Sequence, residues 1–251
     1  MKRVAFMGGK GGVGKTTVAV SAAKALSGAG YGVSLADFDV TGANAHLFLD
    51  ILQDYEVAGE RIIPARAKID GRPVRFLSLA LVSDSFVGFK DEIPGKFVEQ
   101  VTLQTDWGDS DYLVIDAPPG THGDARKIAE LADVVVLVAI GGKLGALDLR
   151  RTVEMLRGHR KPIAGAYVNF SKYTCECGRS VPLFGEPELE VPVIEEIPFL
   201  GRSPKEGRPP LPELDAGRLV HHLSNPVVLP ERPKRTLKGR LVEALLRTVG
   251  A

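Results

Sequence analysis

The sequence lacks the features that mark several large classes of protein. Its 251 residues include two cysteines, Cys175 and Cys177, too few for the disulfide framework of a small secreted domain. No apolar run approaches the roughly 20 residues that span a bilayer, and the short run before Gly8 is not a signal peptide. We therefore expect a cytoplasmic protein.

The chain also lacks an excess of charge of either sign. Its 32 basic and 31 acidic side chains give a formal net charge of +1, whereas a nucleic-acid binder normally has a clear basic excess. We therefore expect no nucleic-acid partner. The hydrophobic share of 44% is enough to build a substantial core in a soluble chain.

Short apolar runs rich in β-branched residues alternate with longer helical patterns. This alternation predicts an α/β fold with a doubly wound, mostly parallel sheet. Runs such as VVVLVAI are apolar on both faces, which is typical of strands covered by helices on both sides. We predict strands at 3–7, 33–36, 74–80, 112–116, 134–140, 164–168 and 193–197, and helices at 15–27, 94–105, 123–131 and 146–156.

We expect a single domain over residues 1–251. Residues 203–235 are rich in proline and charge, which predicts irregular chain around one short helix at 213–223. An amphipathic helix is predicted at 237–249. Its polar face has few basic residues and the helix has no aromatic residue, so packing on the sheet is favoured over membrane anchoring.

Residues 8–17 read GGKGGVGKTT and match the phosphate-binding pattern G-x-x-x-x-G-K-[ST]. They lie between a predicted strand and a predicted helix, where glycines let backbone N–H groups approach phosphate oxygens. We expect Lys15 to reach the β- and γ-phosphates and the Thr16 hydroxyl to bind Mg²⁺. The expected nucleotide-binding residues of this loop are Gly9, Gly11, Gly12, Val13, Gly14, Lys15, Thr16 and Thr17.

Carboxylates end two of the predicted strands. Asp37 and Asp39 alternate, so both leave one face at the carboxyl end of the second strand, where open α/β sheets bind ligands. Carboxylates there can hold Mg²⁺ through water or position an attacking water. Asp116 follows the apolar run at 112–115, which is typical of a metal-side Walker B carboxylate.

These motifs resemble a known family. The string KGGVGKTT is similar to the deviant phosphate loop of the MinD/ParA/nitrogenase-iron-protein ATPases, and DAPPGT at 116–121 resembles the Mrp-type branch. The resemblance covers residues 1 to about 200. It implies slow ATP hydrolysis in a homodimer, with Lys10 crossing to the partner's nucleotide. It also implies that Asp39 orients the attacking water and that Asp37 supports Mg²⁺.

The resemblance extends to the segment that carries the cysteines. It implies that Asn169 reads the adenine edge and that Pro198 packs near the base. Mrp-type proteins have a similar run of Asn, Ser, two cysteines and Phe-Gly, and their cysteines hold one iron–sulfur cluster across the dimer axis. The ligand count agrees, because a two-fold dimer offers the four thiolates that such a site needs.

The cysteine spacing departs from the family, because this chain has C-x-C where the family has C-x-x-C. In an extended segment the Cα atoms of residues i and i+2 lie roughly 6.5 Å apart on one side, so both thiolates can bind one metal. A C-x-C pair also resembles the nickel-insertion ATPases of carbon monoxide dehydrogenase. The metal therefore stays open between an iron–sulfur cluster, zinc and nickel, with two ordinary thiols as a further reading.

From these observations we expect an ATP-hydrolysing homodimeric carrier that assembles or transfers an iron–sulfur cluster to apo iron–sulfur proteins. Two alternatives remain. The first is a MinD/ParA-like positioning ATPase that binds membrane or DNA, although a membrane partner is not favoured by the C-terminal pattern. The second is a nickel- or zinc-insertion metallochaperone.

Overall fold

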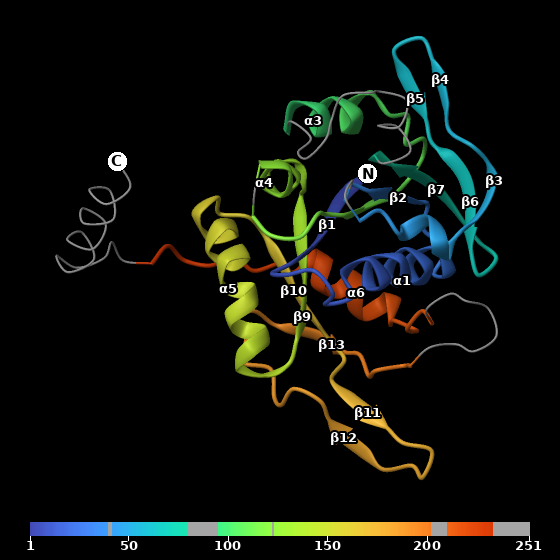
Figure 1. Cartoon of the computed structure of the whole chain (residues 1–251). Coiled ribbons are helices and arrows are strands. Elements are labelled where there is room, and N and C mark those ends of the chain that lie inside the picture. Colours follow the sequence, from blue (N-terminus) through green and yellow to red (C-terminus); the bar gives the residue numbers. More distant parts are fainter. Residues whose placement is uncertain (40–41, 80–94, 122, 202–209, 233–251) are drawn as a thin grey trace.

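A computed structural model describes residues 1–39, 42–79, 95–121, 123–201 and 210–232 of the chain (Figure 1). The helix predicted at 237–249 lies outside these residues, as do parts of the segments predicted at 74–80, 94–105 and 203–235. None of the described helices has the length and apolar character needed to cross a membrane.

The centre of the structure is a nine-stranded sheet of order β13-β10-β9-β1-β8-β2-β7-β6-β3. The strands from β13 to β7 pair in parallel, whereas β6 and β3 extend the sheet antiparallel to their neighbours. The strands are β1 (Lys2–Gly8), β2 (Val33–Asp37), β3 (Asp50–Gln53), β6 (Ala65–Ile69), β7 (Arg72–Ser78), β8 (Tyr112–Asp116), β9 (Val134–Ile140), β10 (Ile163–Asn169) and β13 (Val193–Glu196).

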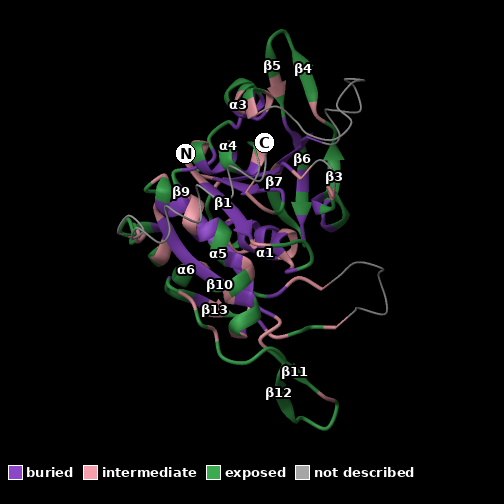
Figure 2. Cartoon of the chain, turned by 60° about the vertical axis from the view of Figure 1, so that its left-hand side comes forward, coloured by how far each residue is buried: buried purple, intermediate pink, exposed green. Residues whose placement is uncertain are grey.

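Helices cover both faces of this sheet, as the apolar runs predict (Figure 2). In β1 the buried side chains of Val4 and Phe6 join one core cluster, and those of Ala5 and Met7 join the other. On the first face lie α1 (Lys15–Gly28), the short 3-10 helix η1 (Ala45–Phe48) and α6 (Ala216–Ser224). On the second lie α3 (Gly95–Gln104), α4 (Gly123–Leu131) and α5 (Gly142–Gly158).

The predicted strands and helices within the described residues are found, with ends shifted by a few residues. Strands β8 and β9 begin and end at the predicted residues. The helix predicted at 213–223 begins later, because the Asp215 side chain accepts a hydrogen bond from the Arg218 backbone N–H (3.0 Å) and caps α6. Buried Leu219 and Leu223 then pack this helix on the sheet.

Two short hairpins project from the body of the molecule (Figure 1). The first pairs β4 (Glu56–Ala58) with β5 (Arg61–Ile63), and the second pairs β11 (Lys172–Thr174) with β12 (Ser180–Pro182). The sequence predicted neither. The second hairpin corrects the expectation of an extended C-x-C segment, because Cys175 and Cys177 lie in its turn.

Candidate functional site

The phosphate-loop residues follow β1 and lead into α1, as the motif predicts. Gly14 precedes the first residue of α1 with φ +81°, and Gly12 has φ +85°, conformations that glycine adopts without strain. A Cβ on Gly11 or Gly12 would meet nothing within 4 Å. The loop therefore presents open backbone at the start of a helix, which is an arrangement suited to a phosphate chain.

Asp116 forms hydrogen bonds with the two polar side chains at the start of α1. The Lys15 Nζ donates to Asp116 Oδ1 at 2.6 Å, and the Thr16 hydroxyl donates to Asp116 Oδ2 at 2.5 Å. Asp116 is fully buried and Lys15 is 7% exposed. Burial raises the pKa of Asp116, against the lowering effect of the Lys15 ammonium. The structure thus brings the three predicted side chains into direct contact.

Asp37 lies beside Asp116, because the two residues are register partners at the carboxyl ends of neighbouring β2 and β8. Its carboxylate accepts backbone N–H groups of Asp39 (3.2 Å) and Ala45 (3.1 Å). Burial and, next, repulsion by Asp116 raise the pKa of Asp37 to about 7. Asp39 itself accepts the Gly42 N–H at 3.1 Å and is half-buried at the end of the same strand.

This donor set fits Mg²⁺. Asp37, Asp116 and Thr16 offer only oxygen atoms, which are the ligands of hard divalent cations. Two buried carboxylates held next to each other are also stabilised by a cation between them, which would lower the raised pKa of Asp37. Among the described residues, no group of three or more His, Cys, Asp or Glu side chains is placed to hold a metal ion by itself; Mg²⁺ in nucleotide sites usually takes its other ligands from phosphate and water.

Lys10 contacts a different element of the fold. It forms an ion pair with Asp148 of α5, in which the Lys10 side chain is 64% exposed and that of Asp148 is 15% exposed. Because its Lys10 side lies in solvent, we expect this pair to contribute about 1 kcal/mol or less, so Lys10 can exchange it for another partner. Sequence reasoning missed Asp148, because no motif marks it.

Helix α5 lies against the beginning of the loop. A Cβ built on Gly9 would lie 2.0 Å from the Asp148 backbone oxygen, and the Thr152 hydroxyl donates to the Gly8 carbonyl at 3.3 Å. Gly9 is therefore required for close packing between the loop and α5, in addition to any contact with phosphate.

Gly9→Ala is expected to lower the free energy of unfolding by about 1–3 kcal/mol, because the added methyl group must displace backbone. Gly11→Ala is the matched control, since its Cβ would meet nothing within 4 Å, and it should change stability by less than about 1 kcal/mol. Urea denaturation of the two variants without nucleotide measures the difference. Equal midpoints would show that α5 does not constrain the loop.

The raised pKa of Asp37 predicts a pH-dependent stability. The folded value of about 7 lies above the ordinary value of 3.8, so the folded state holds this proton more tightly. The stabilisation is full below about pH 4 and is lost as the pH rises through 7, by up to about 1.4 kcal/mol per pH unit. Thermal denaturation between pH 5 and 8 should show a steeper fall for the wild type than for Asp37→Asn; parallel curves would contradict the shift.

Asn169 ends β10 with its amide turned to the phosphate loop. Its Nδ2 donates to the Val13 carbonyl at 2.9 Å, and the residue is 4% exposed. A Cβ on Gly14 would lie 2.2 Å from the same nitrogen. Pro198 follows neighbouring β13 and is half-buried. The predicted contacts of Asn169 and Pro198 with a base stay predictions, whereas the bond from Asn169 to the loop was not foreseen.

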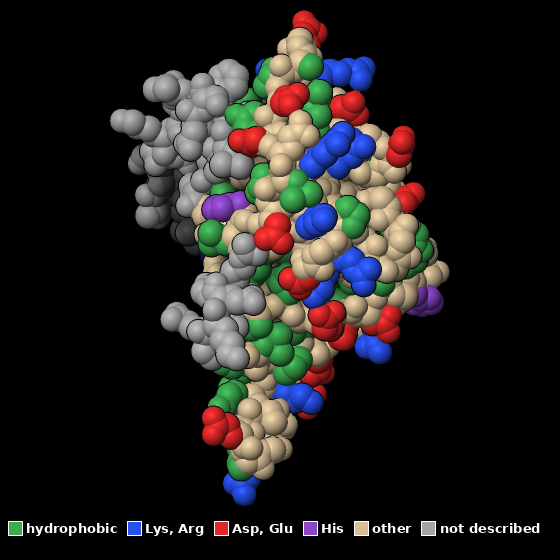
Figure 3. All heavy atoms as spheres, turned by 90° about the vertical axis from the view of Figure 1, so that its right-hand side faces the viewer, with side chains coloured by type: hydrophobic (Ala, Val, Ile, Leu, Met, Phe, Trp, Pro, Cys, Tyr) green, Lys and Arg blue, Asp and Glu red, His purple; other side chains and the backbone are tan. Residues whose placement is uncertain are grey.

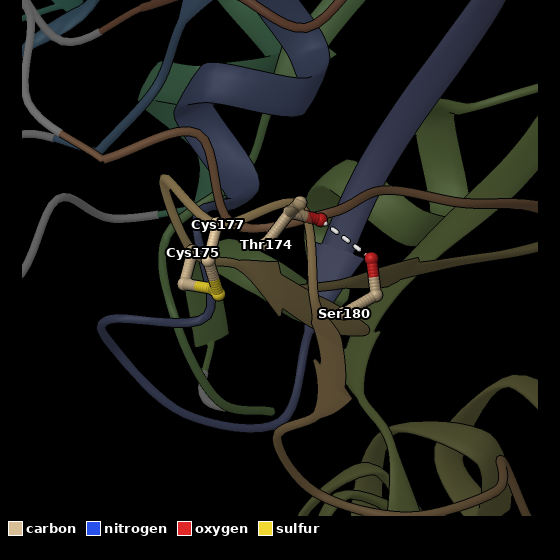
Figure 4. Close-up of a disulfide and its surroundings, with 4 residues drawn as sticks. All are labelled: Thr174, Cys175, Cys177 and Ser180. Carbon is tan, nitrogen blue, oxygen red and sulfur yellow. Dashed lines mark hydrogen bonds between the residues drawn. A yellow bond between two sulfur atoms is a disulfide. The ribbon is translucent and has the colours of Figure 1, made fainter.

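The cysteine pair forms the turn of the exposed hairpin β11–β12 (Figure 4). The sulfur atoms of Cys175 and Cys177 are joined in a disulfide with a Cα–Cα distance of 5.3 Å. The Cys175 N–H donates to the Arg179 carbonyl (3.0 Å), and the Gly178 N–H donates to the Cys175 carbonyl (2.9 Å). The hydroxyl groups of Thr174 and Ser180 bond across the hairpin at 2.7 Å.

A continuous set of contacts joins the phosphate loop to this hairpin. Phe170, directly after Asn169, has φ +56° and its ring faces Gly14, whose built Cβ would lie 3.5 Å from the Phe170 Cζ. The ring centroids of Phe170 and Phe199 lie 5.8 Å apart, and those of Phe199 and Tyr173 of β11 lie 6.3 Å apart. The hairpin therefore begins directly after the end of β10 that contacts the phosphate loop.

Comparisons with known proteins agree with this arrangement. Residues 1–218 match the ParA family model described as NUBPL iron-transfer P-loop NTPase. A Pyrococcus abyssi protein named iron-sulfur cluster carrier protein is 30% identical over 217 residues, which cover 80% of this chain and 73% of that protein. A Pseudomonas fragi protein of the same name is 34% identical over 192 residues, covering 73% and 65% respectively.

Solved structures share the fold. A nucleotide-binding protein from Archaeoglobus fulgidus, solved in complex with ADP, is 25% identical with a TM-score of 0.63, over 78% of this chain and 81% of that one. The cell division ATPase MinD of Pyrococcus furiosus is 21% identical with a TM-score of 0.58, over 89% of this chain and 98% of that one. At that identity the likeness to MinD establishes the fold alone.

Proposed function

The chain belongs to the NUBPL iron-transfer family of P-loop NTPases, and from this premise we propose that it is an ATP-dependent homodimeric carrier of an iron–sulfur cluster. The family membership and the mostly parallel, doubly wound fold predicted from the sequence are thereby confirmed. The P-loop NTPase family supports nucleotide hydrolysis in general. The relatives named iron-sulfur cluster carrier proteins support the cargo. The dimer, the role of each residue and the recipient apoproteins belong to the proposal.

The observation that carries the proposal is the direct connection between the nucleotide loop and the cysteine hairpin. Asn169 is bonded to the Val13 carbonyl at 2.9 Å, and β11 starts three residues later at Lys172. A shift of the loop when the nucleotide changes would therefore be transmitted to the base of the hairpin. This geometry suits a protein in which ATP controls access to Cys175 and Cys177.

In the nucleotide site, each side chain takes the role that its position suits. Lys15 leaves Asp116 to bind the β- and γ-phosphates, and Thr16 and Asp116 hold Mg²⁺ with Asp37 beside them. When bound, Mg²⁺ neutralises charge on the phosphates during transfer. Asp39, half-buried two residues after β2, accepts a hydrogen bond from the attacking water and orients it toward the γ-phosphate.

Two features of the chain support the same two-fold homodimer. The exposed Lys10 side chain exchanges Asp148 for the partner's triphosphate. Each chain supplies two sulfur atoms from an exposed hairpin, so a dimer supplies the four thiolates that hold one cluster. The hairpin also projects from the body, where a recipient apoprotein has access to the cargo.

Reconstitution tests this proposal. After reduction with dithiothreitol, anaerobic addition of iron and sulfide should give visible absorbance and about one cluster per two chains, as the ligand count requires. An apo-ferredoxin should then take up the cluster, and MgATP should change the transfer rate. A chain that takes up only nickel or zinc is a metallochaperone, and one that sediments with liposomes or DNA in ATP is a positioning ATPase; either result overturns the proposal.

Asn169→Ala is expected to uncouple the two sites. In the reduced wild type, a non-hydrolysable ATP analogue should change the iodoacetamide alkylation rate of Cys175 and Cys177 by at least about fivefold, a typical coupling between sites. The variant should show less than about a twofold change, because the loop no longer holds the end of β10. Mass spectrometry measures both rates.

The control is Asn225→Ala, which removes a side-chain amide bonded to the His221 carbonyl at the end of α6. It should respond to the nucleotide as the wild type does. Nucleotide affinity, measured separately, shows whether the Asn169 variant still binds the analogue. An unchanged response in a variant that binds the analogue contradicts the connection through Asn169 and with it the proposed control of the cysteines by ATP, whereas the cargo is tested separately by reconstitution.

A further inference from the structure

A second concave site lies at the sheet edge opposite the nucleotide loop. It is a pocket of about 420 Å³ formed where β2, β7 and β8 begin and closed on one side by β3, β5 and β6. Asp37 and Asp116 lie at the other ends of β2 and β8. Neither the nucleotide site nor the cysteine hairpin uses this pocket.

Three basic side chains, Arg66, Lys68 and Arg75, and one acidic residue, Asp109, line this pocket. Arg66 and Arg75 are direct cross-strand partners in the β6–β7 ladder, an arrangement in which like charges repel. Lys68 lies opposite Asp50 in the β3–β6 ladder, whereas the ion pairs found among the described residues include none to Arg66 or Arg75. On the face that carries β3 and β6, Lys and Arg side chains lie interspersed with Asp and Glu side chains (Figure 3).

The Arg75 guanidinium is held in place by its neighbours. A Cβ on Gly108 would lie 2.2 Å from its Cζ and Nη2, so the planar group lies directly against the Gly108 backbone, where φ is +56°. Arg75 is half-buried. A partly buried guanidinium in a fixed orientation can donate paired hydrogen bonds to a carboxylate or phosphate, and a second cation on the neighbouring strand strengthens the attraction.

Apart from Ser110 and backbone, the rest of the pocket lining is apolar. Leu52 is 62% exposed, Ile63 is 39% exposed and Tyr31 is 36% exposed, although large apolar side chains normally pack away from water. The Tyr31 ring is fixed edge-to-face against Tyr112, with centroids 5.2 Å apart. The volume and the mixture of apolar wall with a few convergent polar groups are those of a small-molecule site.

We propose that this pocket binds a small organic anion, with its phosphate or carboxylate on Arg66 and Arg75 and its apolar body against Tyr31, Leu52 and Ile63. Lys68 adds to the positive potential at the anion. The ligand must have both an anionic group and an apolar portion, because the two arginines bind the anionic group and the apolar side chains of the pocket contact the rest. The site is separate from the proposed carrier function and stands without it.

The test uses phenyl phosphate as the probe, with the full chain saturated with MgADP so that the phosphate loop is occupied. Isothermal titration calorimetry should give saturable binding. Phenylacetate measures the carboxylate alternative. Benzyl alcohol, which lacks the anion, and inorganic phosphate, which lacks the body, should each bind at least about tenfold more weakly.

The matched variants are Arg75→Gln and Arg72→Gln, which remove the same charge from the same strand. Arg72 does not line the pocket. Arg75→Gln should weaken phenyl phosphate at least about tenfold, whereas Arg72→Gln should leave it unchanged. If Arg75→Gln lowers the melting temperature, the exposed Arg66→Gln gives the same test. Equal affinities in all variants, or no saturable binding of either anion below about 10 mM, would overturn the site.

Discussion

Lys10→Ala is expected to lower the rate of ATP hydrolysis by roughly 10³-fold or more, while nucleotide affinity stays within a few-fold of the wild type. A cation supplied from a partner to the transferring phosphoryl group accounts for about 10³–10⁵ in rate in other NTPases. The reason for retained affinity is structural. Lys10 contacts Asp148 of α5, whereas Lys15 and Thr16 are the side chains next to the carboxylates.

Two controls separate this role from a local one. Lys15→Ala should weaken nucleotide binding itself, because it removes the cation at the phosphates. Asp148→Asn releases Lys10 from its ion pair without changing the loop backbone, so hydrolysis should stay the same or rise by up to about fivefold, the equivalent of 1 kcal/mol. Both are measured by phosphate release and by titration with a fluorescent nucleotide.

Mixing two inactive variants decides whether Lys10 acts across the dimer. A Lys10→Ala chain keeps Asp39, and an Asp39→Asn chain keeps Lys10. In a mixed dimer, one site then has both groups if Lys10 comes from the partner. Equal mixing should restore about a quarter of wild-type activity, because half of the dimers are mixed and each has one complete site. A mixture that stays inactive although mixed dimers form would place Lys10 in its own chain's site.

The parallel part of the sheet could be predicted because each of its strands has a recognisable sequence pattern. The run at 134–140 is apolar on both faces, and that pattern fixes its burial between two layers of helices. The phosphate loop was equally readable, since glycine spacing, Lys15 and Thr16 form one local motif. The carboxylates at positions 37 and 116 follow from strand ends that meet at one edge of a parallel sheet.

The antiparallel extension was missed although part of it had a signal. In β6, buried Ala65, Ala67 and Ile69 alternate with exposed Arg66 and Lys68, which is the period-two pattern of a half-buried strand. The hairpin β11–β12 gave no such signal, because all of its strand residues are exposed. Its turn conformation therefore could not be read from the spacing of the two cysteines.

The contacts that tie the site together could not be predicted, because they join segments far apart in sequence. The pairing of Lys10 with Asp148 depends on α5 lying against the loop, and the bond from Asn169 to Val13 depends on β10 lying two strands from β1. Both contacts involve residue types that are common on surfaces and in turns. Only the strand order, which no local pattern encodes, makes them neighbours.

The protein with its disulfide intact is expected to take up no cluster, and the reduced protein about one per two chains. In the structure the sulfur atoms of Cys175 and Cys177 are bonded to each other, whereas iron is held by thiolates. Opening the bond consumes two electrons and two protons and gives two thiols, with a dithiol such as dithiothreitol as the reductant. Alkylation should detect no free thiol per chain before reduction and two after it.

The structure of the hairpin allows the two sulfur atoms to exchange their bond to each other for bonds to iron. The backbone bonds from Cys175 to Arg179 and from Gly178 to Cys175, together with the left-handed Gly178, hold the turn without help from the sulfur atoms. Reduction therefore leaves two thiols on one exposed turn, close enough to bind one metal centre. Ser180→Ala removes the hydroxyl contact with Thr174 and keeps both sulfur atoms, so it should load a cluster as the wild type does.

Cys175→Ser/Cys177→Ser should hold no cluster under any condition, and each single variant should lose it as well, because two thiolates remain where the centre needs four. Iron and sulfide analysis of anaerobic preparations measures the content. A cluster retained by the double variant would place the ligands elsewhere in the chain. Equal loading of protein whose disulfide is shown to be intact would remove thiolates from the cargo site, and with them the reason for a shared centre on the dimer axis.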